Sequence, residues 1–284
     1  MTAEEMLARL LYRDGLMLVI DKPAGLPVHR GPKGGAALED HFDALRFELP
    51  RAPALAHRLD RDTSGCLVLG RHRKALAALG KLFKQGKVGK IYWAVVEGAL
   101  PADEGRIELA LAKRDESRGW WMKADARGLP SVTTWKVMGR HLPSSRATER
   151  SEGGPGPILP GGAIADNAGI MGPRLRGDDK QFTWLALEPL TGRTHQLRVH
   201  CAEMGFPIVG DSIYGSAPRV AGPPLHLHAR QVTVPISKNK PPVTVTAPVP
   251  PHMRELLGAC GWSGETDSVH SRASGHPEIK TPTR

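Results

Sequence analysis

Residues 57–65 read HRLDRDTSG and lead directly into the short apolar segment CLVL at residues 66–69. Two arginines, two aspartates and one histidine fall within the first six positions of this stretch. A charged loop that precedes a buried strand is a common place for reactive groups. The alternative is a solvated turn in which Asp, Ser and Thr side chains bond to their own backbone. The spacing alone leaves both interpretations open.

A second polar cluster, TGRTHQLRVH, occupies residues 191–200. We expect a helix over residues 192–204, because Leu197, Cys201 and Met204 recur at i, i+4 and i+7. In that helix Arg198 lies about 100° from the apolar stripe, at the edge of the buried face. From there it could reach a carboxylate in a cleft. The alternative is an ordinary amphipathic helix with basic residues at its rim.

Short apolar and β-branched runs bounded by turn residues predict the strands. They lie at residues 16–20, 66–69, 91–96, 131–138, 182–187, 231–234 and 243–247. A further helix is expected over residues 36–48, where Leu38, Phe42 and Leu45 fall on one side.

Residues 71–90 carry seven Lys or Arg and no acidic residue. Leu76, Leu79 and Phe83 form a helical apolar stripe there, which leaves the basic residues facing solvent. Most charge runs are simply solvated faces. In a chain with a formal charge of +10, however, contact with a nucleic-acid backbone is a second use for such a face.

Residues 144–180 differ from the rest of the chain in composition and in hydrophobic periodicity. Its 37 residues hold 8 Gly and 4 Pro, no aromatic residue, and neither helical nor strand periodicity. We expect a disordered insertion, because a structureless loop of this length is unusual inside a compact domain. It separates two predicted strands that would otherwise form a hairpin. We expect one catalytic domain over residues 1–257, interrupted by this insertion, and a loose tail over 258–284.

Charge and cysteine usage restrict the class of protein. The chain has 39 Lys and Arg against 29 Asp and Glu, and this excess favours a polyanionic partner. No apolar run approaches the ~20 residues of a membrane helix, and the N-terminus lacks the apolar stretch of a signal peptide. The three cysteines form no CxxC pair. We therefore expect a reduced cytoplasmic protein with no membrane association.

The histidines do not predict a metal site. His195 and His200 are spaced i, i+5, which does not put both on one helix face, and no third ligand accompanies His226 and His228. Structural histidines are the expected interpretation. A GxxxxGK[ST] loop is also absent from the sequence, which disfavours a zinc or nucleotide hydrolase.

Four blocks together resemble the RluA family of RNA pseudouridine synthases. They are DKPAGLPVH at 21–29, HRLDRDTSG at 57–65, KIYWAVVEG at 90–98, and GRTHQLRVH at 192–200 followed by GFPIVGDSIYG at 205–215, in family order. The resemblance covers residues 14–250 apart from the insertion. It implies an α+β fold with a mixed, largely antiparallel sheet and flanking helices. Few residues precede the first block, so we expect no S4-type RNA-binding module.

The resemblance also implies roles for particular residues. Asp60 is the implied catalytic carboxylate, Arg58 enters the RNA stack that the target base has left, and Tyr92 stacks on the target uracil as a candidate for proton transfer. Arg198 is implied to pair with the catalytic carboxylate. The remaining polar residues that we expect to bind substrate are His57, Arg61, Thr63, Lys90, Arg193 and His195.

Three other aspartates are given structural roles. Asp62 occupies a position that the family motif leaves variable, so we expect it in a turn or at the surface. Asp21 and Asp211 lie in family blocks and are expected to fix loops.

The implied activity is isomerisation of uridine in structured rRNA and/or tRNA. This chemistry needs an ionised carboxylate, which either attacks the sugar or takes a sugar proton, and no metal or organic cofactor. No obligate protein partner is evident from the sequence. The alternative is a catalytically silent RNA-binding protein of the same fold.

Overall fold

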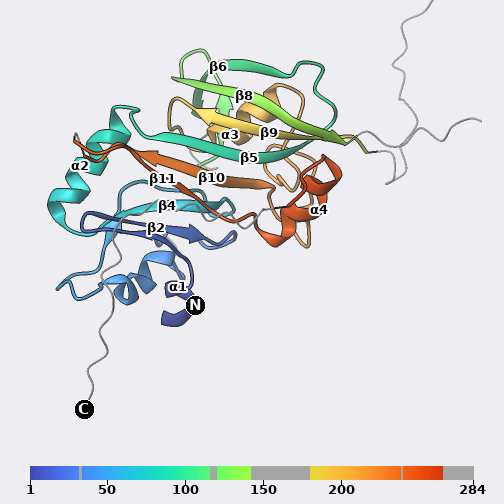
Figure 1. Ribbon diagram of the computed structural model, residues 1–284. Helices are drawn as coiled ribbons and strands as arrows, with labels where there is room; N and C mark the ends of the chain where they lie inside the picture. Colours follow the sequence, from blue (N-terminus) through green and yellow to red (C-terminus); the bar gives the residue numbers. More distant parts are fainter. Residues whose placement is uncertain (32–33, 116–119, 142–179, 238, 265–284) are drawn as a thin grey trace, which may run out of the picture.

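The computed structural model describes residues 1–31, 34–115, 120–141, 180–237 and 239–264, and these residues form one sheet of eleven strands (Figure 1). The main order is β1-β2-β4-β10-β5-β9-β8-β6-β7, with β3 paired to β4 and β11 paired to β10. The strand bounds are β1 Leu10–Arg13, β2 Met17–Lys22, β3 Ala54–Leu55, β4 Ser64–Gly70, β5 Gly89–Glu97, β6 Glu104–Lys113, β7 Met122–Ala124, β8 Leu129–His141, β9 Phe182–Pro189, β10 Leu227–Val234 and β11 Val243–Thr246.

Five helices flank the sheet in the described part of the chain. They are α1 Ala3–Leu7, the 3₁₀ helix η1 Leu38–Leu45, α2 Arg73–Lys84, α3 Gln196–Glu203 and α4 Pro251–Ala259. Every described strand pair is antiparallel except β4 with β10, which is parallel. The expected mixed, largely antiparallel α+β fold is confirmed.

The parallel β4–β10 contact joins the two halves of the sheet, and Gly65 makes it possible. Gly65 has a φ of +102°, and a Cβ atom there would lie 2.3 Å from the carbonyl oxygen of Ala229. Only glycine tolerates both that dihedral and that approach. The neighbouring Ser64 hydroxyl adds a buried hydrogen bond of 2.9 Å to Nδ1 of His228. The glycine of HRLDRDTSG therefore fixes where β10 meets β4.

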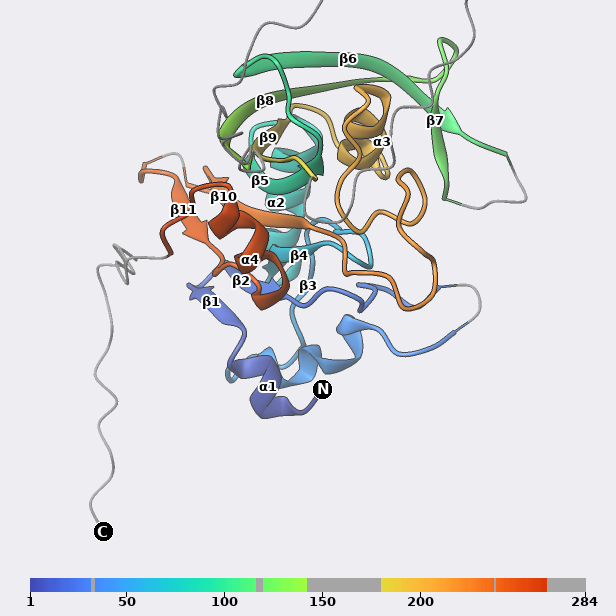
Figure 2. The ribbon, with the colours of Figure 1, turned by 90° about the vertical axis from the view of Figure 1, so that its right-hand side faces the viewer.

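Helices cover both faces of the sheet in both halves. In the half with β2 and β4, one face packs on α1 and η1 and the other on Leu79 of α2 and Val245 of β11. In the half with β5 and β9, α3 covers one face through Leu197 and Cys201, and α4 covers the other through Met253. Figure 2 shows α3 inside the curve of β6, β8 and β7. Alternation along β5 separates the two cores, since Ala94 and Val96 face α3 while Val95 faces α4.

All seven predicted strands are present, as β2, β4, β5, β8, β9, β10 and β11. The basic helix is α2, in which Leu79 is buried while the lysines and arginines are exposed. The predicted strands 131–138 and 182–187 pair with each other, since β8 and β9 are antiparallel neighbours with His141 opposite Phe182.

Two predicted helices are shorter than expected. The helix over 36–48 is a 3₁₀ helix from Leu38 to Leu45, and the left-handed backbone of Phe47 and Glu48 prevents its continuation. The helix over 192–204 begins only at Gln196, because His195 before it is left-handed, with a φ of 52°. Left-handed residues cannot be part of an α-helix.

The expected end of the domain, residue 257, lies inside helix α4, two residues before the helix ends. α4 runs to Ala259, and the next residue, Cys260, is only 3% exposed within the core formed with Trp184 and Met253. The predicted insertion, apart from Lys180, lies outside the described residues, as does the predicted tail from residue 265 onward. No helix in the described part of the chain is long and apolar enough to cross a membrane.

Candidate active site

A cavity of about 570 Å³ opens between the two halves of the sheet. Its walls are the loop before β4, the C-terminal end of α2, the start of β5, and the segment that leads from β9 into α3. Among the described residues that line it, five are basic and one is acidic. The basic residues are Arg58, Lys84, Lys90, Arg193 and Arg198, and the acidic residue is Asp60. This balance suits a polyanion with one reactive carboxylate beneath it.

Asp60 lies in a tight turn at the base of this cavity. The backbone N–H of Thr63 donates to the carbonyl of Asp60 at 3.2 Å, which closes the turn before β4. The Asp60 side chain is 21% exposed, so its carboxylate is reachable from the cavity. Asp62, two residues later, points away toward Arg61 at 3.8 Å with a side chain that is 47% exposed. This agrees with the expected surface role of Asp62.

Lys22 holds this loop in place, and it is the site residue that the sequence reasoning missed. Its side chain is fully buried, and its Nζ donates to the carbonyls of Pro23, Arg61 and Thr63 at 2.7, 2.8 and 2.8 Å. All three ammonium protons are thus used on backbone that flanks Asp60. Burial lowers the pKa of Lys22 to about 7, although Asp62 and Asp60 oppose that shift. The signal was present in the DKPAGLPVH block, where a lysine follows the expected loop aspartate.

Tyr92 enters the same cavity from the middle of β5, opposite Leu187 of β9. Its ring packs partly against both neighbouring apolar cores. Burial, with the nearby negative charge of Asp60, raises the pKa of the Tyr92 phenol well above its usual value. The hydroxyl is therefore protonated at neutral pH, and the ring shares the cavity with Asp60.

Arg198 lines the cavity but does not pair with Asp60, which corrects the expectation from the family resemblance. Its guanidinium forms two hydrogen bonds with Asp211, from Nε at 2.8 Å and from Nη2 at 2.6 Å. Arg198 is 3% exposed and Asp211 is 1% exposed, so Arg198 lies inside the buried face of α3 rather than at its edge. Although burial opposes the charge, hydrogen bonding to Asp211 and the fields of Asp211 and Asp60 raise the pKa of Arg198.

Asp211 also fixes its own loop, as expected. Its Oδ1 accepts the backbone N–H groups of Ile213 and Tyr214, each at 2.9 Å. Burial tends to raise the pKa of Asp211, but the hydrogen bonds from Arg198 and from this backbone lower it below the usual range. The pairing therefore keeps both side chains ionised, and the Asp60 carboxylate also contributes to raising the pKa of Arg198.

His195, the residue directly before α3, lies close to Asp60. Its Nε2 lies 4.0 Å from Oδ2 of Asp60, and its Nδ1 lies 2.8 Å from the hydroxyl of Tyr214. Burial lowers the pKa of His195, with the opposing field of Asp60 a smaller influence. The imidazole is therefore neutral at neutral pH.

The other residues expected to bind substrate divide into two groups. Arg58, Thr63, Lys90 and Arg193 all line the cavity, and Arg58 is exposed. Arg61 does not line it, because its guanidinium donates to the carbonyl of Gly25 at 3.0 Å.

His57 lines the cavity, yet its polar edge is directed into the protein. Its Nε2 accepts the backbone N–H of Val68 at 3.0 Å, and its ring stacks on Phe83 with a centroid distance of 4.4 Å. Burial, followed by the charge of Lys90, lowers the pKa of His57 to about 3. Its polar contact is thus with β4, and this contact anchors the loop that leads to Asp60.

The three other histidines considered as metal ligands, His200, His226 and His228, each have a hydrogen-bond partner. His200 lies 2.8 Å from the Ser131 hydroxyl, His226 bonds the carbonyl of Pro224 at 2.9 Å, and His228 pairs with Ser64. Within the described ranges, no three His, Cys, Asp or Glu side chains come close enough together to hold a metal ion.

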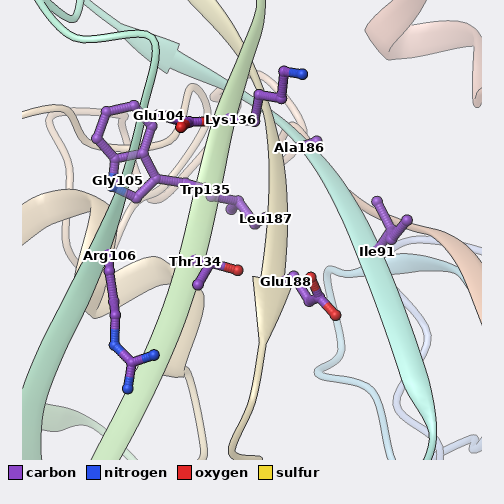
Figure 3. Close-up of a pocket in the computed structure, with 10 residues that line it drawn as sticks. All are labelled: Ile91, Glu104, Gly105, Arg106, Thr134, Trp135, Lys136, Ala186, Leu187 and Glu188. Atoms are coloured by element: carbon purple, nitrogen blue, oxygen red, sulfur yellow. The ribbon is translucent and has the colours of Figure 1, made fainter.

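A second hollow, of about 450 Å³, lies against strands β5, β6, β8 and β9 (Figure 3). Its charged residues are mixed, with Glu104 and Glu188 against Arg106 and Lys136. Ile91 lines this hollow, whereas its strand neighbour Tyr92 lines the cavity around Asp60. Successive strand residues face opposite sides, so the second hollow lies across the sheet from the candidate site.

Solved structures with the same arrangement define the class of fold. The structure of human RNA pseudouridylate synthase domain containing 4 matches with a TM-score of 0.66 at 22% identity, over 91% of this chain and 95% of that one. Human RNA pseudouridylate synthase domain containing 1 matches with a TM-score of 0.63 at 25% identity, over 92% and 89%. The chain therefore has the fold of the pseudouridine synthases.

Sequence comparisons give the family. A family model described as RNA pseudouridylate synthase matches residues 16–203. An uncharacterized RNA pseudouridine synthase of Zymomonas mobilis is 36% identical over 252 residues, 87% of this chain and 96% of the relative. The ribosomal large subunit pseudouridine synthase C of Haemophilus ducreyi is 32% identical over 263 residues, 89% of this chain and 69% of the relative. The chain belongs to the RluA family of RNA pseudouridine synthases, which are isomerases.

Proposed function

We propose that the protein isomerises particular uridines in structured rRNA and/or tRNA, with Asp60 as the catalytic carboxylate and Tyr92 and Arg198 beside it. The observation that carries this proposal is the convergence of Asp60 and Tyr92 in one basic cavity, although 32 positions separate them in the chain. Relatives named as ribosomal large subunit pseudouridine synthases favour rRNA as the substrate.

The reaction breaks the bond between C1′ of the ribose and N1 of uracil and forms a bond from C1′ to C5. The hydrogen on C5 leaves as a proton and a proton is gained at N1, so the change is an isomerisation without redox chemistry. Asp60 acts as an anion, by attacking C1′ or by removing a sugar proton. The fixed charge of Arg198, held by Asp211, favours that anion. The flat, protonated Tyr92 supports the freed uracil while it turns.

The target base has to leave its stack before it enters the cavity, which costs a few kcal/mol. Arg58 lies two residues before Asp60 in the sequence and is exposed at the cavity wall. Its planar guanidinium is suited to fill the gap that the target base leaves in the stack. Lys84, at the end of α2, and Arg193, in the segment before α3, add positive charge on the other walls of the cavity. Phosphate contacts by these side chains position the RNA without reading its sequence.

Release of tritium from RNA labelled at uridine C5 tests the activity directly. The probe is total RNA labelled with [5-³H]uridine and isolated from a strain that lacks the gene. We expect the purified protein to release tritium, and pseudouridine mapping of that strain with and without the gene to identify the sites. RNA binding without tritium release would support the silent RNA-binding protein instead.

The RNA-binding surface has a separate test in the salt dependence of affinity. Replacing Lys84 by Gln removes one cation at the cavity, so log affinity should depend less steeply on log salt by about one charge. Arg46→Gln is the matched control, since Arg46 is exposed but paired with Asp43 on η1. If log affinity depends equally steeply on log salt for Lys84→Gln and the wild type, the end of α2 does not contact the RNA backbone.

A further inference from the structure

The nearest ionisable nitrogen recorded at the Asp60 carboxylate belongs to His195, because the guanidinium of Arg198 is engaged by Asp211. His195 Nε2 and Asp60 Oδ2 are 4.0 Å apart, and the two side chains are 10% and 21% exposed. Neither group is freely solvated, so their relative orientation is set by the protein rather than by water.

The backbone of His195 is held in an unfavourable conformation. Its φ of 52° and ψ of 16° are left-handed, and its side chain makes no capping hydrogen bond to α3. A left-handed residue other than glycine costs about 1–2 kcal/mol, and such residues cluster at functional sites. The next residue, Gln196, holds the turn, because its amide bonds the carbonyl of Val132 and the hydroxyl of Thr133, each at 3.0 Å. The strained backbone directs the imidazole into the cavity.

The contacts of the Tyr214 hydroxyl bear on which nitrogen of the His195 imidazole carries the proton. The Tyr214 hydroxyl accepts the backbone N–H of Met122 at 2.8 Å and lies 2.8 Å from Nδ1 of His195. A phenol has one proton to donate, and giving that proton to Nδ1, while the oxygen accepts the Met122 N–H, uses both functions of the hydroxyl. Nδ1 is then the acceptor, and the single proton of the neutral imidazole is on Nε2. That N–H is the group that faces Asp60.

We propose that His195 is a positioning residue for the catalytic carboxylate: Tyr214 fixes its tautomer, and its Nε2–H orients Asp60. The proposal rests on the proposed role of Asp60. A movement of about 1 Å brings Nε2 within hydrogen-bond distance of the carboxylate. The neutral Nε2–H of His195 then donates to Oδ2 and orients the Asp60 carboxylate without neutralising its negative charge. Oδ1 of Asp60 stays available for the ribose.

The tautomer is measurable in the free protein. In long-range ¹H–¹⁵N spectra of protein labelled with ¹⁵N-histidine, we expect His195 at pH 7 to carry its proton on Nε2 alone, with the signal assigned by its loss in His195→Asn. In Tyr214→Phe the hydroxyl is gone, and a shift of the His195 signals toward the other tautomer is expected. A proton on Nδ1 in the wild type, or an unchanged spectrum in Tyr214→Phe, contradicts the proposal.

Two replacements at the same position separate positioning from RNA binding. Asn matches the Nδ1 side of the ring and tolerates left-handed backbone, but it has no group near Nε2. Gln places an amide N–H near the position of Nε2. With excess enzyme on the [5-³H]uridine RNA, we expect His195→Asn to lower the single-turnover rate about 100-fold, with RNA affinity unchanged, because small misplacements of reacting groups have effects of that size. His195→Gln should recover about tenfold.

The outcomes distinguish this proposal from the proposed function. If both variants lose RNA affinity in parallel with rate, or if neither loses rate, His195 does not position Asp60. If the wild type itself releases no tritium, the proposed isomerase activity has failed, while the tautomer measurement still reports on the Tyr214–His195 contact.

Discussion

The carboxylate of Asp211 binds the guanidinium of Arg198 through two hydrogen bonds, of 2.6 and 2.8 Å, and so Arg198 is a fixed buried charge rather than a direct partner of Asp60. Removing one member of a buried ion pair leaves the other uncompensated, which typically destabilises a protein by about 3–5 kcal/mol. Both side chains are nearly inaccessible.

We therefore expect Asp211→Asn to lower the free energy of unfolding by about 3–5 kcal/mol in urea titrations. The amide oxygen can still accept the backbone N–H groups of Ile213 and Tyr214, whereas the new NH₂ group cannot accept the Nε–H of Arg198, so the change removes the charge and one hydrogen bond of the pair. Asp62→Asn is the matched control, since its exposed pair with Arg61 should contribute at most about 1 kcal/mol. Equal stability of the two variants would contradict this account of the pair.

Gly65→Ala should separate the two halves of the sheet. The added Cβ would lie 2.3 Å from the carbonyl oxygen of Ala229, on a backbone with positive φ, so either β10 or the loop that carries Asp60 has to move. We expect no stably folded protein by circular dichroism and thermal melting. Gly80→Ala is the control, because a Cβ there meets nothing within 4 Å and Ala favours the helix by about 1 kcal/mol. A stable Gly65→Ala protein would show that the β4–β10 contact does not organise the fold.

His200 should make the protein less stable in mild acid. It is fully buried, and burial lowers its pKa to about 4, below the ordinary value of about 6.5. The unfolded chain therefore binds the proton first, and the stability present above pH 6.5 is lost as the pH falls toward 4. Between pH 7 and pH 5 this amounts to about 2 kcal/mol.

Urea titrations of the wild type and of His200→Gln at pH 7 and pH 5 measure this contribution. The variant should lose about 2 kcal/mol less than the wild type over that interval. The pKa of His57 is also lowered, to about 3, so His57 also reduces the stability of both proteins as the pH falls. The difference between the wild type and His200→Gln therefore isolates the contribution of His200. Parallel losses in the two proteins would mean that His200 is not the acid-sensitive group.

The sequence predicted the strands that carry continuous apolar runs, together with the cavity residues Asp60, Tyr92 and Arg198. It missed β6, because residues 107–113, IELALAK, are rich in residues that favour helices. Pairing with β8 overrides that preference in the folded protein. It also missed α4 and the full extent of its core, because the helix has only nine residues and only two of them, Met253 and Leu257, are buried.

At the site, local patterns could not predict partners that are distant in the chain. The motif identified Arg198, but its choice of Asp211 over Asp60 depends on how the loop after residue 205 folds back on α3. The role of Lys22 likewise depends on carbonyls about 40 residues away, at Arg61 and Thr63, and a carbonyl carries no sequence signal. The left-handed His195 shortened a helix that its apolar spacing predicts as continuous.

Deleting residues 144–180 should leave the fold and the isomerase activity nearly unchanged. The flanking strands β8 and β9 already pair up to His141 and Phe182, so a short hairpin loop can join them. Each halving of a flexible loop recovers only ~0.6 kcal/mol, so unfolding should show a neutral or mildly stabilising change. A deletion protein that folds normally but loses most of its RNA affinity would make this segment part of the RNA-binding surface.

The proposed function depends on Asp60, rather than its neighbour Asp62, as the catalytic carboxylate. The most direct measurement is tritium release under single-turnover conditions by Asp60→Asn and Asp62→Asn, with RNA affinity measured alongside. Asp60→Asn should abolish release while it binds RNA as the wild type does, because the amide keeps the shape and removes the charge. Asp62→Asn should retain most of the rate. An active Asp60→Asn, or an Asp62→Asn that binds RNA without turnover, would contradict the account.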